Sequence, residues 1–397
     1  MLLCQLPPLQ CWSRVRFTWL APYLSLAFAG CSGELRNSDA ARAEWEGAWI
    51  DTMAVALLGR GDDIPLYQLR GAVLSGDTIV VAERSTGKLH FFKRSGEFLK
   101  SVGGLGGGPG EFDYLWRIQK VGEDIYAYDI TMRRVSQFAS NGSFVGSVRI
   151  DPVEGYTNLG LAGVFADGSL LVGAFTVDDG RYEGLYRRTV VLLRYDAEGT
   201  YLDSLGAYED SDHYAESAST YGYMTLAPFG RRAISLPSGG HYYVLENNDY
   251  RIGVFDQNGT KVRELRPAEE PRVPVSPEHL EAIRRYYASF WSKVPDAVAP
   301  KIRDVFDRIP KPDTFPPYGW HGGARVEIAR VSSVGDLWVL NGDDLPGWTV
   351  FTEEGTVRGH VRAFEELDVL DADDDIAVVL CWDELDVETV EVRRIRR

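Results

Sequence analysis

The chain has 397 residues, of which 45% are hydrophobic and 12% aromatic, so it is long and apolar enough to bury a core. Charged residues make up 25% of the chain, and this composition excludes a wholly disordered protein. The 42 basic and 58 acidic side chains give a net charge of −16, which argues against non-specific binding to nucleic acid or to anionic membranes, since both require clustered positive charge.

The first thirty residues have the pattern of an export signal. Arg14 and Arg16 precede an apolar stretch at 17–30. This stretch is too short to span a bilayer, because a spanning helix needs about 20 residues, but its length suits the apolar region of a signal peptide. We therefore predict a signal peptide at 1–30.

The end of that stretch predicts a lipid anchor. Ala29-Gly30-Cys31 resembles the lipobox of bacterial lipoproteins, although Phe28 stands where that box usually carries an aliphatic residue. We expect lipidation of Cys31, a polar tether at 31–45, and a protein held at the outside of the cytoplasmic membrane, in the bacterial cell envelope, by its lipid alone. An ordinary cleaved signal, or an uncleaved anchor, is the alternative. Of the remaining cysteines, Cys381 lies in an apolar run and is interpreted as a buried core thiol.

A repeated pattern organises the rest of the chain. An aromatic residue stands four residues before a turn glycine at five places: Phe92 and Gly96, Phe138 and Gly142, Tyr195 and Gly199, Phe255 and Gly259, Phe351 and Gly355. A polar turn that leads into a short strand occurs six times, at 77–81, 124–128, 168–172, 240–245, 336–340 and 375–380. The sixth unit ends at Arg397 with three strands, and residues 48–57 supply its fourth. The pattern predicts an all-β ring of six four-stranded antiparallel sheets at 46–397, closed by the N-terminal strand.

At this point the chain resembles the six-bladed β-propellers of the NHL type, including bacterial exported lipoproteins with that fold. The resemblance rests on 106–112, 122–129 and 134–138, and again on 241–246 and 251–259. The third and fifth units depart from the family pattern, because they carry insertions and lack its Asp after the second strand. Propellers of this type include enzymes, binding platforms and scaffolds, so the resemblance implies a fold and not an activity.

Three long insertions are expected on one face of the ring. They lie at 176–188, 209–231 and 267–323, the last between the fourth and fifth blades, and the chain order of a blade brings all of them to the same side. In the longest, Ser276 is a candidate N-cap for a helix at 277–284, and a second helix is predicted at 297–309. This helical insertion is expected to act as a ligand lid or as a structural plug.

Arginines recur where the innermost strands are expected to begin. Those strands should start near Leu69, Trp116, Arg231 and Arg325, which places arginines at one mouth of the channel, with aromatic residues beside them. The candidate ligand-binding residues are Arg70, Trp116, Arg117, Arg231, Trp320, His321 and Arg325. Such a cluster suits a carboxylate or a phosphate. The alternative is that each arginine pairs with an acid of the neighbouring blade.

No catalytic residue and no metal ligand set is predicted, since the six histidines show no metal-binding spacing. Residues 371–375 (Asp-Ala-Asp-Asp-Asp) look like part of a calcium loop but lack its remaining ligands, so we interpret them as a solvated turn. We expect a monomeric envelope lipoprotein without a cofactor, which binds a small acidic ligand or an envelope protein through its loop-rich face. One alternative is an enzyme of the lactonase or lyase kind, with a divalent metal such as calcium in the channel. The other is a pure protein-interaction scaffold.

Overall fold

The computed structural model of the protein describes residues 45–59, 64, 66–177, 182–215, 224–227, 229–266, 274–281, 284, 307–314, 316, 328–341, 347–365, 367–382 and 387–397. The predicted signal peptide, Cys31, Trp320, His321 and Arg325 lie outside these residues. Residues Arg42–Arg397 form one compact unit.

The first four blades are four-stranded antiparallel sheets in which strand order follows chain order. Blade 1 comprises β2 (Leu69–Ser75), β3 (Thr78–Glu83), β4 (Lys88–Lys93) and β5 (Phe98–Gly103). Blade 2 comprises β6 (Leu115–Val121), β7 (Asp124–Asp129), β8 (Arg134–Phe138) and β9 (Phe144–Arg149). Blade 3 comprises β10 (Tyr156–Val164), β11 (Leu170–Thr176), β13 (Thr189–Tyr195) and β14 (Tyr201–Glu209). Blade 4 comprises β17 (Ala233–Ser238), β18 (His241–Glu246), β19 (Ile252–Asp256) and β20 (Lys261–Leu265).

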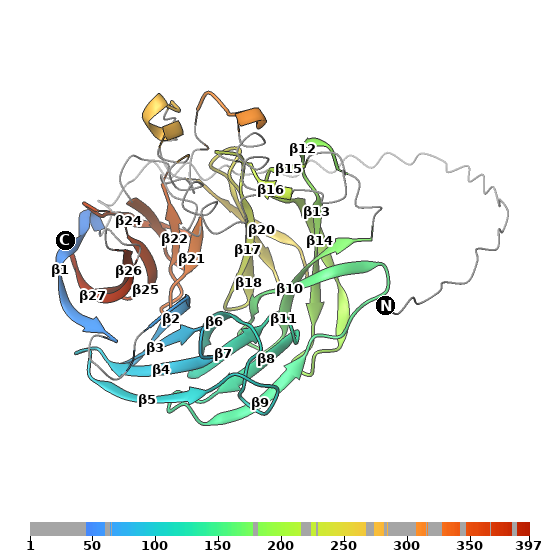
Figure 1. Ribbon diagram of the computed structural model, residues 1–397. Coiled ribbons are helices and arrows are strands. Elements are labelled where there is room, and N and C mark those ends of the chain that lie inside the picture. Colours follow the sequence, from blue (N-terminus) through green and yellow to red (C-terminus); the bar gives the residue numbers. More distant parts are fainter. Residues whose placement is uncertain are drawn as a thin grey trace, which may run out of the picture. The chain divides into compact units, whose positions relative to one another are not determined.

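The N-terminal strand closes the ring, as the repeat pattern predicts. Blade 5 comprises β21 (Ala329–Val331), β22 (Leu337–Leu340), β23 (Gly347–Phe351) and β24 (Val357–Arg362), and blade 6 comprises β25 (Asp368–Ala372), β26 (Ile376–Trp382), β27 (Glu388–Arg396) and β1 (Trp45–Leu58). β1 pairs antiparallel with β27 and parallel with β24, so hydrogen bonds join blades 5 and 6 into one sheet (Figure 1). β1 begins at Trp45, which had been predicted as the last residue of the tether.

The core consists of apolar clusters between neighbouring blades. Each of the six gaps around the ring contains one, and pairs that represent them are Leu74 with Val378, Val80 with Ile125, Val135 with Val172, Leu192 with Tyr242, Leu245 with Val339, and Trp348 with Val379. Because the middle strands are covered on both faces, β3 is apolar and almost fully buried along its length.

The predicted turn glycines stand in the hairpins between the third and fourth strands of blades 1–5. Their φ angles are positive, between 76° at Gly142 and 88° at Gly96, a region that L-residues with a side chain seldom adopt. At Gly199 a Cβ atom would also collide with the backbone carbonyl of Arg149 in blade 2. The glycine is therefore needed both for the turn and for the close approach of two blades.

The first two insertions pair with each other. β12 (Gly184–Tyr186) comes from the first, and β15 (His213–Ala215) and β16 (Met224–Leu226) come from the second; the three form a small antiparallel sheet. Ala227, which follows β16, packs against Ile309 of the third insertion. All three insertions thus lie together, as expected from the order of strands in a blade.

The third insertion has a fixed stem and a capped helical turn. Pro274 and Thr314 form an antiparallel bridge that brings its ends together. Residues 277–281 are helical, and the N–H of His279 donates to Oγ of Ser276 at 3.4 Å, which confirms the predicted N-cap. Of the second predicted helix, only residues 307 and 308 are described as helical. An ion pair of 2.9 Å between Arg284 and Asp307 joins the two helical segments.

Candidate functional site

The innermost strands of all six blades line a pocket at the centre of the ring. We call it the channel pocket; its walls include Arg70, Arg117, Ala162, Leu236, Arg330 and Asp371, one from each of β2, β6, β10, β17, β21 and β25. Its volume is about 80 Å³. A water molecule needs roughly 10–15 Å³ by this measure, so the pocket holds several waters or the head group of an acid.

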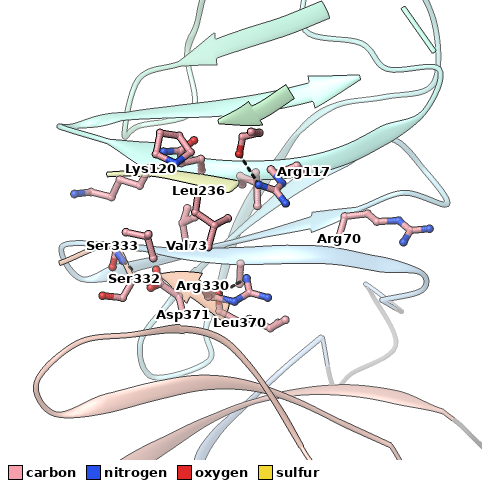
Figure 2. A pocket seen from close by; sticks show the side chains of 16 residues that line it. Arg70, Val73, Arg117, Lys120, Leu236, Arg330, Ser332, Ser333, Leu370 and Asp371 are labelled. Carbon is pink, nitrogen blue, oxygen red and sulfur yellow. Dashed lines mark hydrogen bonds between the residues drawn. The ribbon is translucent and has the colours of Figure 1, made fainter. Parts of the chain in front are cut away.

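Three arginine side chains gather at one end of the channel pocket. Figure 2 shows the guanidinium groups of Arg70, Arg117 and Arg330 on the same side, whereas Lys120 points to the opposite side. The second and third insertions lead into the first residues of β17 and β21, and all six inner strands begin at that face. Since Arg70 and Arg117 lie near the start of their strands, this end is the mouth that faces the insertions.

Two of these arginines are held by the neighbouring blade. Nη1 of Arg117 donates to the carbonyl oxygen of Ala162 in blade 3 at 2.6 Å, and Nη1 of Arg330 donates to that of Leu370 in blade 6 at 2.7 Å. Both acceptors are bulged residues: the register of β10 passes from Leu161 to Gly163, and that of β25 from Val369 to Asp371. The bulges thus fix the orientation of the arginines. The alternative of a partner in the next blade is correct in part, since these partners are carbonyls and not acids.

Arg70 stands on aromatic rings. Its Cζ lies 5.1 Å from the ring centroid of Trp116 and 5.9 Å from that of Tyr114, within the range of cation–π attraction. Arg70 is itself the bulged residue of β2, because the register passes from Leu69 to Gly71. Its Nε is buried and has no hydrogen-bond partner in the part of the chain that the structure describes. The predicted aromatic neighbour, Trp116, therefore contributes to the site through Arg70.

Asp371 is the one acid among the described residues that line the channel pocket, and it is fully used by the backbone. Its Oδ2 accepts from the N–H of Leu74 in blade 1 at 2.6 Å, and its Oδ1 accepts from the N–H groups of Ser333 and Ala372, each at 2.8 Å. Burial raises the pKa of this carboxyl group above its ordinary value. The interpretation of Asp371 as part of a solvated turn is wrong: it is a buried residue of β25, and only 373–375 form the turn.

The wall between blades 2, 3 and 4 is rigid. The side-chain amide of Gln119 forms two hydrogen bonds with the backbone of Val164, at 2.8 Å and 3.0 Å. Next to it, a Cβ atom on Gly163 would lie 2.5 Å from Cγ of Pro237 and 2.7 Å from Oε1 of Gln119. The three inner strands approach each other this closely only because residue 163 is a glycine.

The sequence placed two of the three channel arginines correctly. Arg70 and Arg117 line the channel pocket, but Arg231 does not: it precedes β17, which starts at Ala233, and its Nη2 lies 3.9 Å from Oε1 of Glu246. Arg330 was missed, because β21 starts at Ala329 and not near Arg325. A usable signal existed, since Arg117 and Arg330 each stand five residues before a turn glycine, Gly122 and Gly335, of their first hairpin.

Arg231 instead lies in a second pocket, of about 400 Å³, which we call the insertion pocket. Its lining includes Leu185 of the first insertion, Phe229 and Arg231 of the second, and Pro310, Lys311 and Pro316 of the third. It shares no lining residue with the channel pocket. Nothing in the repeat pattern pointed to it, because it arises where three insertions of unrelated sequence meet.

Two further searches concern the described residues alone. Among them, no group of three or more His, Cys, Asp or Glu side chains is placed to hold a metal ion. In the same part of the chain, no helix is both long and apolar enough to cross a membrane.

Comparison with known proteins supports the architecture. A family model described as a 6-bladed beta-propeller matches residues 50–157, and no curated protein matches the chain. A solved structure from Bacteroides fragilis NCTC 9343, of a protein described as exported, is similar at 14% identity and a TM-score of 0.46, covering 90% of this chain and 97% of that one. Virginiamycin B lyase from Staphylococcus aureus is similar at 10% identity and a TM-score of 0.38, covering 87% and 99%. The finer resemblance to the NHL type stays a prediction. By its six closed sheets and by the family match, the chain is a six-bladed β-propeller.

Proposed function

We propose that this protein is an exported, lipid-anchored binding module that captures small acidic molecules at the insertion-bearing mouth of its channel. The observation that carries the proposal is the convergence of Arg70, Arg117 and Arg330 on one end of the channel pocket. A guanidinium group matches the geometry of carboxylate and phosphate oxygens and keeps its charge at any ordinary pH.

The charge distribution supports an anionic ligand. The chain as a whole carries −16, yet its channel mouth presents three cations. Asp371, the acid described in the same pocket, accepts three backbone hydrogen bonds and has a raised pKa, so it offsets these cations less than an exposed carboxylate would. A cleft with low-dielectric walls focuses such a field and attracts a ligand of opposite sign.

The size of the channel pocket limits what enters it. About 80 Å³ is well below the roughly 300–1,000 Å³ of pockets that enclose a whole organic ligand. We infer that the ligand places its anionic group between the arginines and leaves the rest of its body at the mouth, beside Trp116, which is 40% exposed.

The proposed location rests on the sequence. The apolar stretch at 17–30, ended by Ala29-Gly30-Cys31, supports export and lipidation of Cys31. Anchoring by a lipid would keep the propeller at the envelope, where it meets exported or incoming molecules.

Equilibrium dialysis against radiolabelled inorganic phosphate tests the anion site. Residues 42–397 form a compact unit and can be used alone, at low ionic strength so that salt does not screen the interaction. We expect one phosphate per chain, and at least tenfold weaker binding by the variant Arg117→Gln/Arg330→Gln. Glutamine keeps an N–H donor for the carbonyl oxygens of Ala162 and Leu370, which limits the loss of stability.

The matched control is Arg251→Gln/Arg266→Gln, which removes two exposed arginines of blade 4 and should leave phosphate binding unchanged. Equal loss in both variants would show that phosphate responds only to net charge, and undiminished binding by Arg117→Gln/Arg330→Gln would contradict the site. A stoichiometric divalent metal in the purified protein, with metal-dependent lactonase or lyase activity, would favour the enzyme alternative.

A further inference from the structure

We infer that the insertion pocket is a second binding site, which encloses a whole amphipathic organic anion: a molecule with an apolar body and one carboxylate or sulfonate group. Because the two pockets share no lining residue, this proposal is independent of the proposed function of the channel pocket.

The size and origin of the insertion pocket set it apart from the channel pocket. Its volume of about 400 Å³ falls within the roughly 300–1,000 Å³ range of small-molecule sites. Each of the three insertions contributes to its wall, through Leu185, Phe229 and Pro310 respectively. Loops that a rigid scaffold brings together in this way are common carriers of binding sites.

The apolar part of the wall is preorganised. Leu185, Phe229 and three prolines, at 310, 312 and 316, face the pocket. The proline rings fix their own φ angles, and the bridge between Pro274 and Thr314 holds the segment that carries them. A wall that is ordered before binding costs the ligand little conformational entropy.

One turn of this wall is strained. Phe229 has φ of +56°, in a turn closed by the N–H of Gly230 and the carbonyl oxygen of Ala227, 3.1 Å apart. A buried, bulky residue in this region is an outlier, and such strain persists where the surroundings enforce it, often at a binding site. A Cβ atom at residue 230 would lie 2.8 Å from Cβ of Asp212, so the turn is pressed against that residue.

The charges in the pocket select an anion. Arg231 and Lys311 supply two cations, and Asp212 is the acid among the described lining residues. Oδ1 of Asp212 accepts from Nε of Arg187, and its Oδ2 accepts from the N–H of Arg231 at 2.9 Å. Burial lowers the pKa of Lys311, and an entering anion would compensate its partly desolvated ammonium group. Glu246, 3.9 Å from Arg231, is the acidic side chain that a ligand would compete with.

A matched pair of fluorescent probes tests the proposal. Anilinonaphthalene sulfonate has an aromatic body and a sulfonate, and N-phenylnaphthylamine has the same body without the charge; both brighten in an apolar pocket. Titrated into residues 42–397, the sulfonate should bind with one-to-one stoichiometry and at least tenfold more tightly than the neutral probe.

Removal of the two cations should act on the charged probe alone. We expect Arg231→Gln/Lys311→Gln to weaken the sulfonate about 10- to 100-fold and the neutral probe less than about twofold, since hydrogen bonds to charged groups are stronger than neutral ones. The control Lys261→Gln/Arg266→Gln removes one lysine and one arginine at exposed positions of blade 4 and should change neither affinity. Arg117→Gln/Arg330→Gln should also leave both affinities unchanged, which separates this site from the channel pocket.

A footprint on the unmodified chain covers the case in which the double variant does not fold. Acetylation of Lys311, followed by mass spectrometry, should slow in the presence of the sulfonate, while acetylation of Lys261 should not. Equal affinity for the two probes, or a Lys311 acetylation rate that the sulfonate does not change, would overturn the proposal.

Discussion

The guanidinium group of Arg117 donates a 2.6 Å hydrogen bond to the backbone carbonyl of Ala162, across the gap between blades 2 and 3. Arg330 makes the same contact with Leu370, between blades 5 and 6. Blades 2 and 5 stand opposite each other in a ring of six, so the two arginines reach the channel from opposite sides. Each bond stabilises a junction between blades and also orients a positive charge toward the mouth.

The close packing beside these contacts predicts different effects for two glycines of the same strand. In Gly163→Ala the new methyl group would meet Pro237 and Gln119, so we expect a loss of about 1–3 kcal/mol in the free energy of unfolding, typical of overpacking. Gly160→Ala is the control, because a Cβ there meets nothing within 4 Å. Urea denaturation measures both, and a Gly163→Ala variant as stable as Gly160→Ala would show that the inner strands can move apart.

The sequence was informative wherever the repeat applied. The turn glycines and the strand before each hairpin located all six blades, and Arg70 and Arg117 followed from the start of the first two. The register of β21 was lost because the insertion before it has no period that leads into the strand, so Arg325 was chosen in place of Arg330. The insertion pocket could not be predicted, since contacts such as that of Ala227 with Ile309 join segments far apart in the chain without a shared pattern.

The closure of the ring predicts that β1 is essential for stability. It contributes Trp45, Ile50 and Leu58 to the core, all at most 3% exposed, and it pairs with both β24 and β27. A chain that starts at residue 59 should melt well below one that starts at residue 45, because β27 becomes an open edge and apolar surface is exposed. A synthetic peptide of residues 45–58 should restore part of the difference in thermal melting. Equal melting temperatures for the two chains would contradict the role of β1.

The lipobox predicts a lipid on Cys31. Expressed in a bacterium with its own signal, the protein should incorporate labelled fatty acid and enter the detergent phase on partition. Cys31→Ser should abolish the label, whereas Cys381→Ser, at the partly buried cysteine of β26, should retain it. Label that survives Cys31→Ser would show that the lipobox interpretation is wrong.

Buried tyrosines predict a loss of stability at alkaline pH. Burial raises the pKa of Tyr195, Tyr208, Tyr242 and Tyr243 from the model value of 10.0 to about 12. Between these values the folded chain keeps protons that the unfolded chain releases, so the contribution to stability is complete below about pH 10 and is lost as the pH rises toward 12. Ultraviolet absorbance of phenolate should show these four titrating only as the fold melts. Reversible titration near pH 10 without unfolding would contradict their burial.

The position of a bound anion tests the central claim most directly. Crystals of residues 42–397 soaked in selenate, whose selenium gives an anomalous signal, would show where a tetrahedral oxyanion binds. We predict an anomalous peak at the mouth of the channel pocket, within hydrogen-bond distance of Arg117 and Arg330 and absent in Arg117→Gln/Arg330→Gln. Selenate found only elsewhere on the protein, with the channel mouth empty in the wild-type crystal, would contradict the assignment of this site.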